Sequence, residues 1–242
     1  MAEVISASES TPASVTPGLL SRVFGVLMSP RETYAAVAAR PRAFGVLVVV
    51  LAVVVLAQGI FLSTEVGQQA ALDQNIKAME AFGINIPDEA YQRMEEGITR
   101  APITGAISAI IFWPLLMAII AGLLMGVFTM LMGGDATFKH VFSIVAHSSI
   151  IIAIQQAFSM PLSYARGEFA GANLGVFLPM LEETSFPAKF LGSIDLFLIW
   201  WIVSLSIGIG VLYKRRTGGI ATSLLGVYVA IALVVAFWRS GS

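Results

Sequence analysis

Long apolar runs separated by polar connections dominate the chain. The runs cover residues 43–63, 103–132, 141–161, 190–213 and 220–238. Each is close to or above the roughly 20 residues that a helix needs to cross about 30 Å of hydrocarbon. A segment surrounded by lipid must satisfy its own backbone hydrogen bonds, which favours a helix. The pattern therefore predicts an all-α, polytopic membrane protein built as a bundle of five transmembrane helices.

Two of the runs carry residues that set them apart. The second run is the longest and contains Pro114, so we expect this helix to be tilted or kinked. The third run contains His147, Gln155 and Gln156, which make it the least hydrophobic of the five. Because polar groups are costly in hydrocarbon, we expect the neighbouring helices to screen the third run from lipid.

The N-terminal part of the chain lacks a spanning pattern. Residues 1–16 are rich in Ser, Thr, Ala and Pro, which predicts a disordered cytosolic tail. Residues 17–42 have apolar residues at helical spacing, and Ser29 to Glu32 fit a capping box that begins a second short helix. Four arginines in this segment favour amphipathic helices that lie at the interface with an anionic leaflet (Arg22, Arg31, Arg40 and Arg42).

The connections between the runs differ in charge. Connection 64–102 is acidic, and its segments 66–82 and 87–99 have helix-forming composition with Gly83 between them, which predicts a helical hairpin. Basic residues gather instead before the first run and in the connections that follow the second and fourth runs. The positive-inside rule places these basic segments in the cytoplasm. We therefore expect a cytosolic N-terminus, an extracytoplasmic hairpin and an extracytoplasmic C-terminus.

Composition narrows the functional classes. The chain is 57% hydrophobic and 12% charged, with a mean hydropathy of +0.85, which is far from the balance of a soluble globular domain. A net charge of −1 gives no basic field to attract nucleic acid. There is no cysteine, and His140 and His147 have no further ligand at metal-ligand spacing, so neither a metal site nor a cofactor is expected. The sequence shows no set of residues with the spacing of a known catalytic site, so we do not expect an enzyme.

Asp195 and His147 lie inside predicted membrane spans. An ionisable group at membrane depth is a candidate functional residue by default. Asp195 could equally reach the outer interface, pair with Lys189 or cap the N-terminus of its helix. His147 could shuttle protons, or it could stay neutral and hydrogen-bonded to a neighbouring helix. Together with Gln155 and Gln156, the two residues could also line a polar path through the bundle.

Small residues mark faces where helices can approach closely. Gly122 and Gly126 form a GxxxG pair in the second run, and Ser204 and Gly208 have the same spacing in the fourth. Such pairs indicate helix packing, either within the chain or between copies.

A tryptophan pair is expected in a helix contact, and a glycine pair in a turn. Trp200 and Trp201 fall near the middle of the fourth run, so at least one is expected to pack on another helix, where the indole N–H can find a partner. Gly133 and Gly134 are expected to end the second helix in a tight cytosolic turn.

Three short motifs occur in order along the chain. Ser29 to Tyr34 (SPRETY) precedes the first run, Gly133 to Phe138 (GGDATF) joins the second and third, and Ile194 to Trp200 (IDLFLIW) opens the fourth. In order and spacing these motifs resemble the bacterial branch of the Yip1 membrane family, over roughly residues 20–238. The resemblance implies a multi-pass protein of the bacterial cytoplasmic (inner) membrane. Eukaryotic members bind Rab-type GTPases and act in vesicle traffic, so the resemblance implies an interaction role more than a reaction.

Three functional hypotheses follow from these patterns. The leading one is a non-enzymatic scaffold or accessory protein that contacts the lipid bilayer and acts through other membrane proteins or self-association. The second is a small transporter or channel with a polar path lined by Asp195 and His147. The third is a lipid-binding or membrane-shaping protein that uses residues 17–42 as an interfacial wedge.

Overall fold

The computed structural model describes residues 18–178, 180–182 and 184–241 of the chain. Within these residues the chain is helical and contains no β-strand, so the all-α prediction is confirmed. The predicted tail of residues 1–16 lies outside the described residues.

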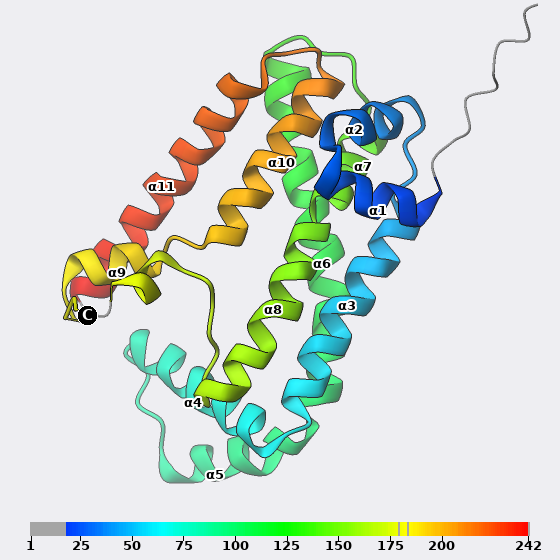
Figure 1. Ribbon diagram of the computed structural model, residues 1–242. Helices are drawn as coiled ribbons and strands as arrows, with labels where there is room; N and C mark the ends of the chain where they lie inside the picture. The colour runs from blue at the N-terminus through cyan, green and yellow to red at the C-terminus, as the bar shows by residue number, and fades with distance from the viewer. Residues whose placement is uncertain (1–17, 179, 183, 242) are drawn as a thin grey trace, which may run out of the picture.

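The helices are joined mostly by short connections, and α4 and α5 lie at the far end of the molecule from α1 and α2 (Figure 1). The α-helices are α1 (Leu19–Met28), α2 (Pro30–Ala39), α3 (Phe44–Leu62), α4 (Glu65–Ala81), α5 (Asp88–Gly97), α6 (Ala101–Met125), α7 (Phe138–Ser148), α8 (Ile150–Arg166), α9 (Phe186–Gly192), α10 (Leu196–Leu212) and α11 (Thr217–Gly241). The shorter turns are the 3₁₀ helices η1 (Ile98–Arg100) and η3 (Leu174–Phe177) and the π-helix η2 (Gly126–Leu131).

Within the described part of the chain, four helical stretches are long and apolar enough to cross a membrane. They are Phe44–Leu62, Asp88–Leu131, Phe138–Arg166 and Thr217–Ser240. The second stretch is 44 residues long because α5, η1, α6 and η2 follow one another without a loop, and α6 continues through Pro114. These four stretches correspond to the first, second, third and fifth predicted runs, with ends within one residue of the first run and of the C-terminal end of the second.

The fourth predicted run is divided in the structure. Instead of one helix over 190–213, α9 ends at Gly192 and α10 begins at Leu196. The break occurs because Asp195 has an extended backbone conformation and caps the new helix with its carboxylate. The apolar helix α10 has 17 residues and is therefore about 26 Å long.

The third membrane stretch, α7 followed by α8, forms the centre of the bundle. Of its most apolar part 67% is buried, against 28% or less in the other three stretches. Helices α3, α6 and α10 surround it, and α1 and α2 cover α7. The predicted screening of the least hydrophobic run is therefore present in the structure, because this run is enclosed by the more apolar helices.

The two N-terminal helices form as the sequence predicts. Helix α2 has Pro30 in its first turn and Glu32 near its N-terminus. The capping box at Ser29 is incomplete, however, because the Ser29 side chain accepts no backbone hydrogen bond. Instead, the Thr33 hydroxyl donates to the Ser29 carbonyl at 3.0 Å. Helices α1 and α2 meet at Gly25, where a Cβ would overlap Thr33 Oγ1, so the close contact requires glycine.

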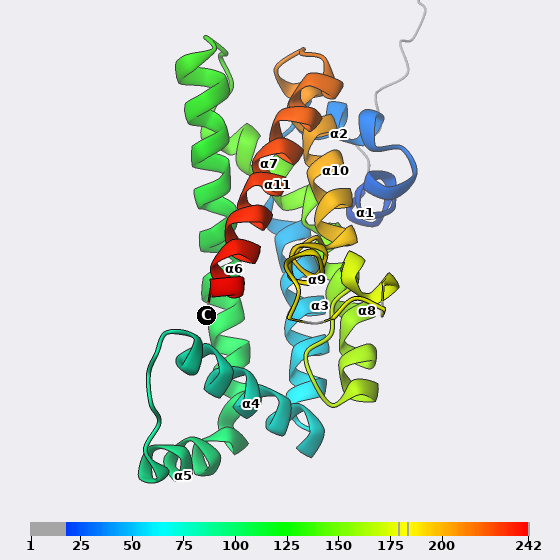
Figure 2. The ribbon, with the colours of Figure 1, turned by 90° about the vertical axis from the view of Figure 1, so that its left-hand side faces the viewer.

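The two ends of the bundle collect different connections (Figures 1 and 2). The turns 132–137 and 213–216 lie at the end near α2, and α4, α5 and the C-terminal end of α8 lie at the other. Helix α4 begins where the Thr64 hydroxyl accepts from Gly67 N at 3.0 Å, and it packs against α3 and η1. Gly83 (φ +73°) ends α4, which confirms the two helices predicted for this connection. The basic turn 213–216 and the acidic helices α4 and α5 thus lie at opposite ends of the bundle.

Candidate functional site

Asp195 is the N-cap of α10. Its Oδ1 accepts from the backbone N–H groups of Phe197 at 2.7 Å and Leu198 at 3.1 Å. Its Oδ2 accepts from Gln155 Nε2 on α8 at 2.9 Å. The carboxylate therefore satisfies two amides that the first turn of a helix leaves free, and it ties α10 to the central helix. Lys189 is not its partner, since the Lys189 ammonium donates to the Arg239 carbonyl at 2.6 Å.

The backbone on either side of Asp195 is also held. An isolated bridge pairs it with Asn173, and Leu196 N donates to the Ala172 carbonyl at 3.0 Å. The Tyr228 hydroxyl of α11 accepts from Asp195 N at 2.8 Å and donates to the Ser193 carbonyl at 3.2 Å. Sequence reasoning missed Tyr228, although it is a polar side chain in an otherwise apolar run. The break between α9 and α10 is thus fully hydrogen-bonded.

His147 has no exposed surface and contacts helix α1. Its Nδ1 lies 2.7 Å from the Ser143 carbonyl, which can only accept, so Nδ1 carries the proton. Nε2 is then free to accept, and Arg22 Nη1 lies 3.4 Å from it. Arg22 Nη1 also donates to the Arg42 carbonyl at 3.2 Å. The arginine of α1 therefore joins the N-terminal segment to a buried histidine of the central helix.

Removing this arginine is expected to loosen α1. The natural chain has no cysteine, so Val26→Cys places a single thiol at a position where the valine is 2% exposed. Arg22→Ala in this background should raise the rate of labelling by a water-soluble maleimide roughly tenfold, since a hydrogen bond to a charged group contributes about 1.5–3 kcal/mol. Arg31→Ala, which removes an exposed arginine of α2, is the matched control and should leave the rate unchanged. Equal rates in all three proteins would show that Arg22 does not hold α1.

Tyr34 of α2 is the second contact between the N-terminal helices and the bundle. It has no exposed surface, and its hydroxyl lies 2.6 Å from Ser204 Oγ on α10. Burial raises the pKa of the Tyr34 phenol, so the hydroxyl is protonated at neutral pH. One turn along α10, a Cβ on Gly208 would overlap Ile144 of α7 and lie 3.1 Å from Tyr34 Cδ1. The small-residue face of α10 is therefore used inside the chain.

Gln156 lines a cavity of about 500 Å³ between α6, α8 and α10. Ser159 Oγ and Trp201 Nε1 belong to the same lining, and both are buried without a hydrogen-bond partner among the described residues. Trp201 packs against the hydrophobic core, whereas Trp200 is 41% exposed and lies beside Phe197. The expected partner for a buried indole N–H is thus not supplied by another helix within this part of the chain.

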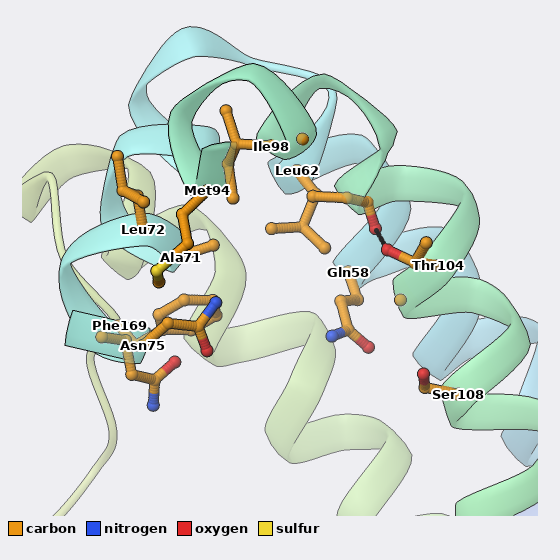
Figure 3. A pocket seen from close by; sticks show the side chains of 14 residues that line it. Gln58, Leu62, Ala71, Leu72, Asn75, Met94, Ile98, Thr104, Ser108 and Phe169 are labelled. Carbon is orange, nitrogen blue, oxygen red and sulfur yellow. Dashed lines mark hydrogen bonds between the residues drawn. The ribbon is translucent and has the colours of Figure 1, made fainter. Parts of the chain in front are cut away.

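A second cavity, of about 440 Å³, lies between α3, α4, η1 and α6 (Figure 3). Its polar lining is uncharged: Gln58 comes from α3, Asn75 from α4, and Thr104 and Ser108 from α6. In Figure 3 the Gln58 amide lies between α3 and α6, and the Thr104 hydroxyl donates to the Ala101 carbonyl at 3.4 Å. No residue that lines it titrates near neutral pH, so the cavity has no acid or base for catalysis.

The remaining predicted glycines differ in their surroundings. Cβ atoms on Gly122 and Gly126 would meet nothing within 4 Å, so the GxxxG face of α6 and η2 is not packed within the described chain. Gly133 has φ +70°, and a Cβ on Gly134 would lie 2.6 Å from the Tyr213 ring. These two glycines therefore allow the tight turn between η2 and α7.

The predicted polar residues do not form one site. Asp195 and Gln155 belong to the α10 cap, His147 contacts Arg22 on α1, and Gln156 lines the cavity beside Trp201. Within the described residues, no group of three His, Asp or Glu side chains is arranged to hold a metal ion. Asp195 and His147 each lie within hydrogen-bonding distance of a side chain from another helix, so their contacts join one helix to the next.

Comparison with known proteins identifies the family. A search of curated proteins and a search of solved structures each found no match. The family model for the Yip1 domain matches residues 24–239, which include the C-terminal half of α1, all of α2 and every membrane stretch except the last residue of the fourth, Ser240. Helix α2 and the capped helix α10 described above lie within this match. The chain therefore belongs to the Yip1 family of membrane proteins.

Proposed function

We propose that this protein is a non-enzymatic scaffold or accessory protein of the bacterial cytoplasmic membrane, acting through its exposed helix faces. The unpacked GxxxG face of α6 and η2 is the observation that carries the proposal. Gly122 and Gly126 have open space where a side chain would be, and Ile119, Leu123 and Met130 around them are 51%, 67% and 73% exposed. Glycine at this spacing lets a second helix approach the backbone closely.

The contrast with α10 supports an external partner for this face. On α10, Ser204 and Gly208 contact Tyr34 and Ile144 of the same chain. On α6, the equivalent small residues contact nothing, so the same geometry remains available to another membrane protein or a second copy. The hydrogen-bonded state of Asp195 and His147 also accords with an anchoring role.

The α6 face is tested by crosslinking in native membranes. Leu123→Cys, in the otherwise cysteine-free chain, should give a crosslinked product of defined mass that mass spectrometry identifies as a partner or a second copy. Adding Gly122→Ile and Gly126→Ile should remove that product, because the branched side chains prevent close helix approach. Gly226→Ile on α11, where a Cβ also meets open space, is the matched control and should retain it. A monomeric protein without a crosslinked partner would exclude the proposal.

The proposed topology has five membrane segments, with α10 as the fourth of them. Helix α10 has no charged residue and joins α9, at the end where α11 finishes, to the basic turn 213–216. Arg31, Lys139 and Lys214 lie in segments at that basic end, which the positive-inside rule assigns to the cytoplasm. The connection that contains α4 and α5 is then an extracytoplasmic helical hairpin, and the C-terminus is extracytoplasmic.

A further inference from the structure

A long apolar groove runs between α6, α10 and α11 and has a volume of about 990 Å³. Its walls come from α6, which is distant in sequence, and from the consecutive helices α10 and α11. Leu123, Val127 and Met132 lie on α6 and its extension, Trp201 and Leu205 on α10, and Leu224, Val227 and Ile231 on α11. Val227 is 58% exposed and Ile231 56% exposed, so the groove is open toward the surroundings of the bundle.

One end of the groove is basic. The turn between α10 and α11 contributes Lys214, Arg215 and Arg216 to the lining, and all three side chains are exposed. Arg215 donates to the Met132 carbonyl at 3.1 Å, which holds the turn against the end of η2. Within the described residues, none of the three forms an ion pair with a carboxylate. Three positive charges therefore lie at one end of the apolar groove, and no carboxylate of the described residues pairs with them.

The same turn opens onto a second cavity of about 690 Å³ on its other side. The groove and this 690 Å³ cavity are both lined by Lys214, Arg215 and Arg216. The cavity is lined in addition by Arg31 of α2. Lys214 has φ +51°, a left-handed conformation that is uncommon for a residue with a side chain. The turn thus places its cations between a cavity beside α2 that is lined by four basic residues and the apolar groove beside α11.

The length of the groove matches one membrane leaflet. Along α11 its lining extends from Gly219 to Ile231, which corresponds to about 18 Å of helix. Half of a hydrocarbon core of about 30 Å is about 15 Å. A molecule with an anionic head at the turn and an apolar tail of one leaflet's depth would therefore fit along the groove.

We propose that this groove binds an anionic phospholipid. Its phosphate contacts Lys214 and Arg216 at the turn, and its acyl chain lies against α6, α10 and α11. Basic residues at the end of membrane helices attract anionic headgroups, and an apolar trough beside them accepts the tail. A partner helix in the groove would leave the three cations unpaired unless it carried its own acids. The groove borders the GxxxG face and shares Leu123 with it, but lipid binding at the basic turn does not depend on the scaffold function.

Native mass spectrometry of the full chain in mild detergent tests the site. With phosphatidylglycerol and phosphatidylcholine of equal chain length added together, we expect phosphatidylglycerol to be retained about tenfold better. Lys214→Asn with Arg216→Gln should remove this preference. Asparagine is chosen because it tolerates positive φ, and Arg215 is kept because it holds the turn. Lys77→Gln with Arg93→Gln makes the same charge change on α4 and α5 and should leave retention unchanged.

A further variant tests the apolar part of the site. Val227→Trp should fill the groove and lower phosphatidylglycerol retention several-fold while leaving the basic turn intact. Inorganic phosphate at the same concentration should not displace the lipid, because it lacks the acyl chain. Equal retention of the two lipids, equal losses in both double variants, full displacement by inorganic phosphate, or an acidic protein bound at the turn instead would each overturn the proposal.

Discussion

Replacing Gly208 by Ala is expected to destabilise the protein by about 1–3 kcal/mol. The added methyl group would overlap Ile144 Cγ2 and lie within 3.2 Å of two atoms of the Tyr34 ring. Ile144 and Tyr34 are fully buried, so neither can move aside without disturbing the contact between α2, α7 and α10. The midpoint of thermal unfolding in mild detergent should fall accordingly.

The same substitution at Gly122 provides the control for this prediction. Gly122 also lies within a membrane helix, but a Cβ there meets nothing within 4 Å. Alanine has a higher helix propensity than glycine, by about 0.5–1 kcal/mol, so Gly122→Ala should be neutral or stabilising. If both variants lost the same stability, the loss would come from alanine in any membrane helix. The close contact of Gly208 with Ile144 and Tyr34 would then not be its cause.

Replacing Asp195 by Ala is expected to cost about 2 kcal/mol or more. Loss of an N-cap typically costs about 1 kcal/mol, and the amides of Phe197 and Leu198 would lose their acceptor. The Gln155 amide would lose its partner as well, and because this donor is only partly buried its loss adds about 1 kcal/mol. Unfolding in mild detergent, followed by circular dichroism, measures the change.

Asp195→Asn separates this anchoring role from a role that needs the negative charge. Asparagine caps helices about as well as aspartate, and its amide can bond to Gln155 after that side chain's amide flips. If Asp195 only anchors α10, the asparagine variant should therefore have near-normal stability and phenotype. The transport hypothesis predicts instead that ion or proton flux in reconstituted vesicles is lost although the variant folds. A folded, stable Asp195→Asn protein without flux that the natural chain shows would favour transport.

Several local features could be predicted because they depend on nearby residues. The turn at Gly133, the helix start at Pro30 and the break at Gly83 follow from backbone preferences that act over a few positions. Enclosure of the third run was also predictable, since its His and Gln residues would be costly beside lipid. The division of the fourth run at Asp195 was not predicted as such, because capping competes with an apolar pattern that extends on both sides of it.

The partners of the polar residues could not be predicted from local pattern. Arg22 lies 125 positions from His147, and Tyr34 lies 170 positions from Ser204. Each of these side chains has several possible partners at its depth in the bundle, and helix rotation and crossing select one of them. The two glycine pairs illustrate the same limit, because identical spacing led to an internal contact on α10 and an open face on α6.

Sequence alone determined that this chain is a helical membrane protein, because hydrocarbon requires long apolar segments to close their backbone hydrogen bonds internally. It also determined the charge segregation between connections. Only the tertiary structure decided which helix faces pack inside the chain and which remain exposed. It also decided that Asp195 is an N-cap beside Gln155. Packing between distant helices makes these choices, since shape complementarity at a helix crossing depends on both partners and on their relative rotation.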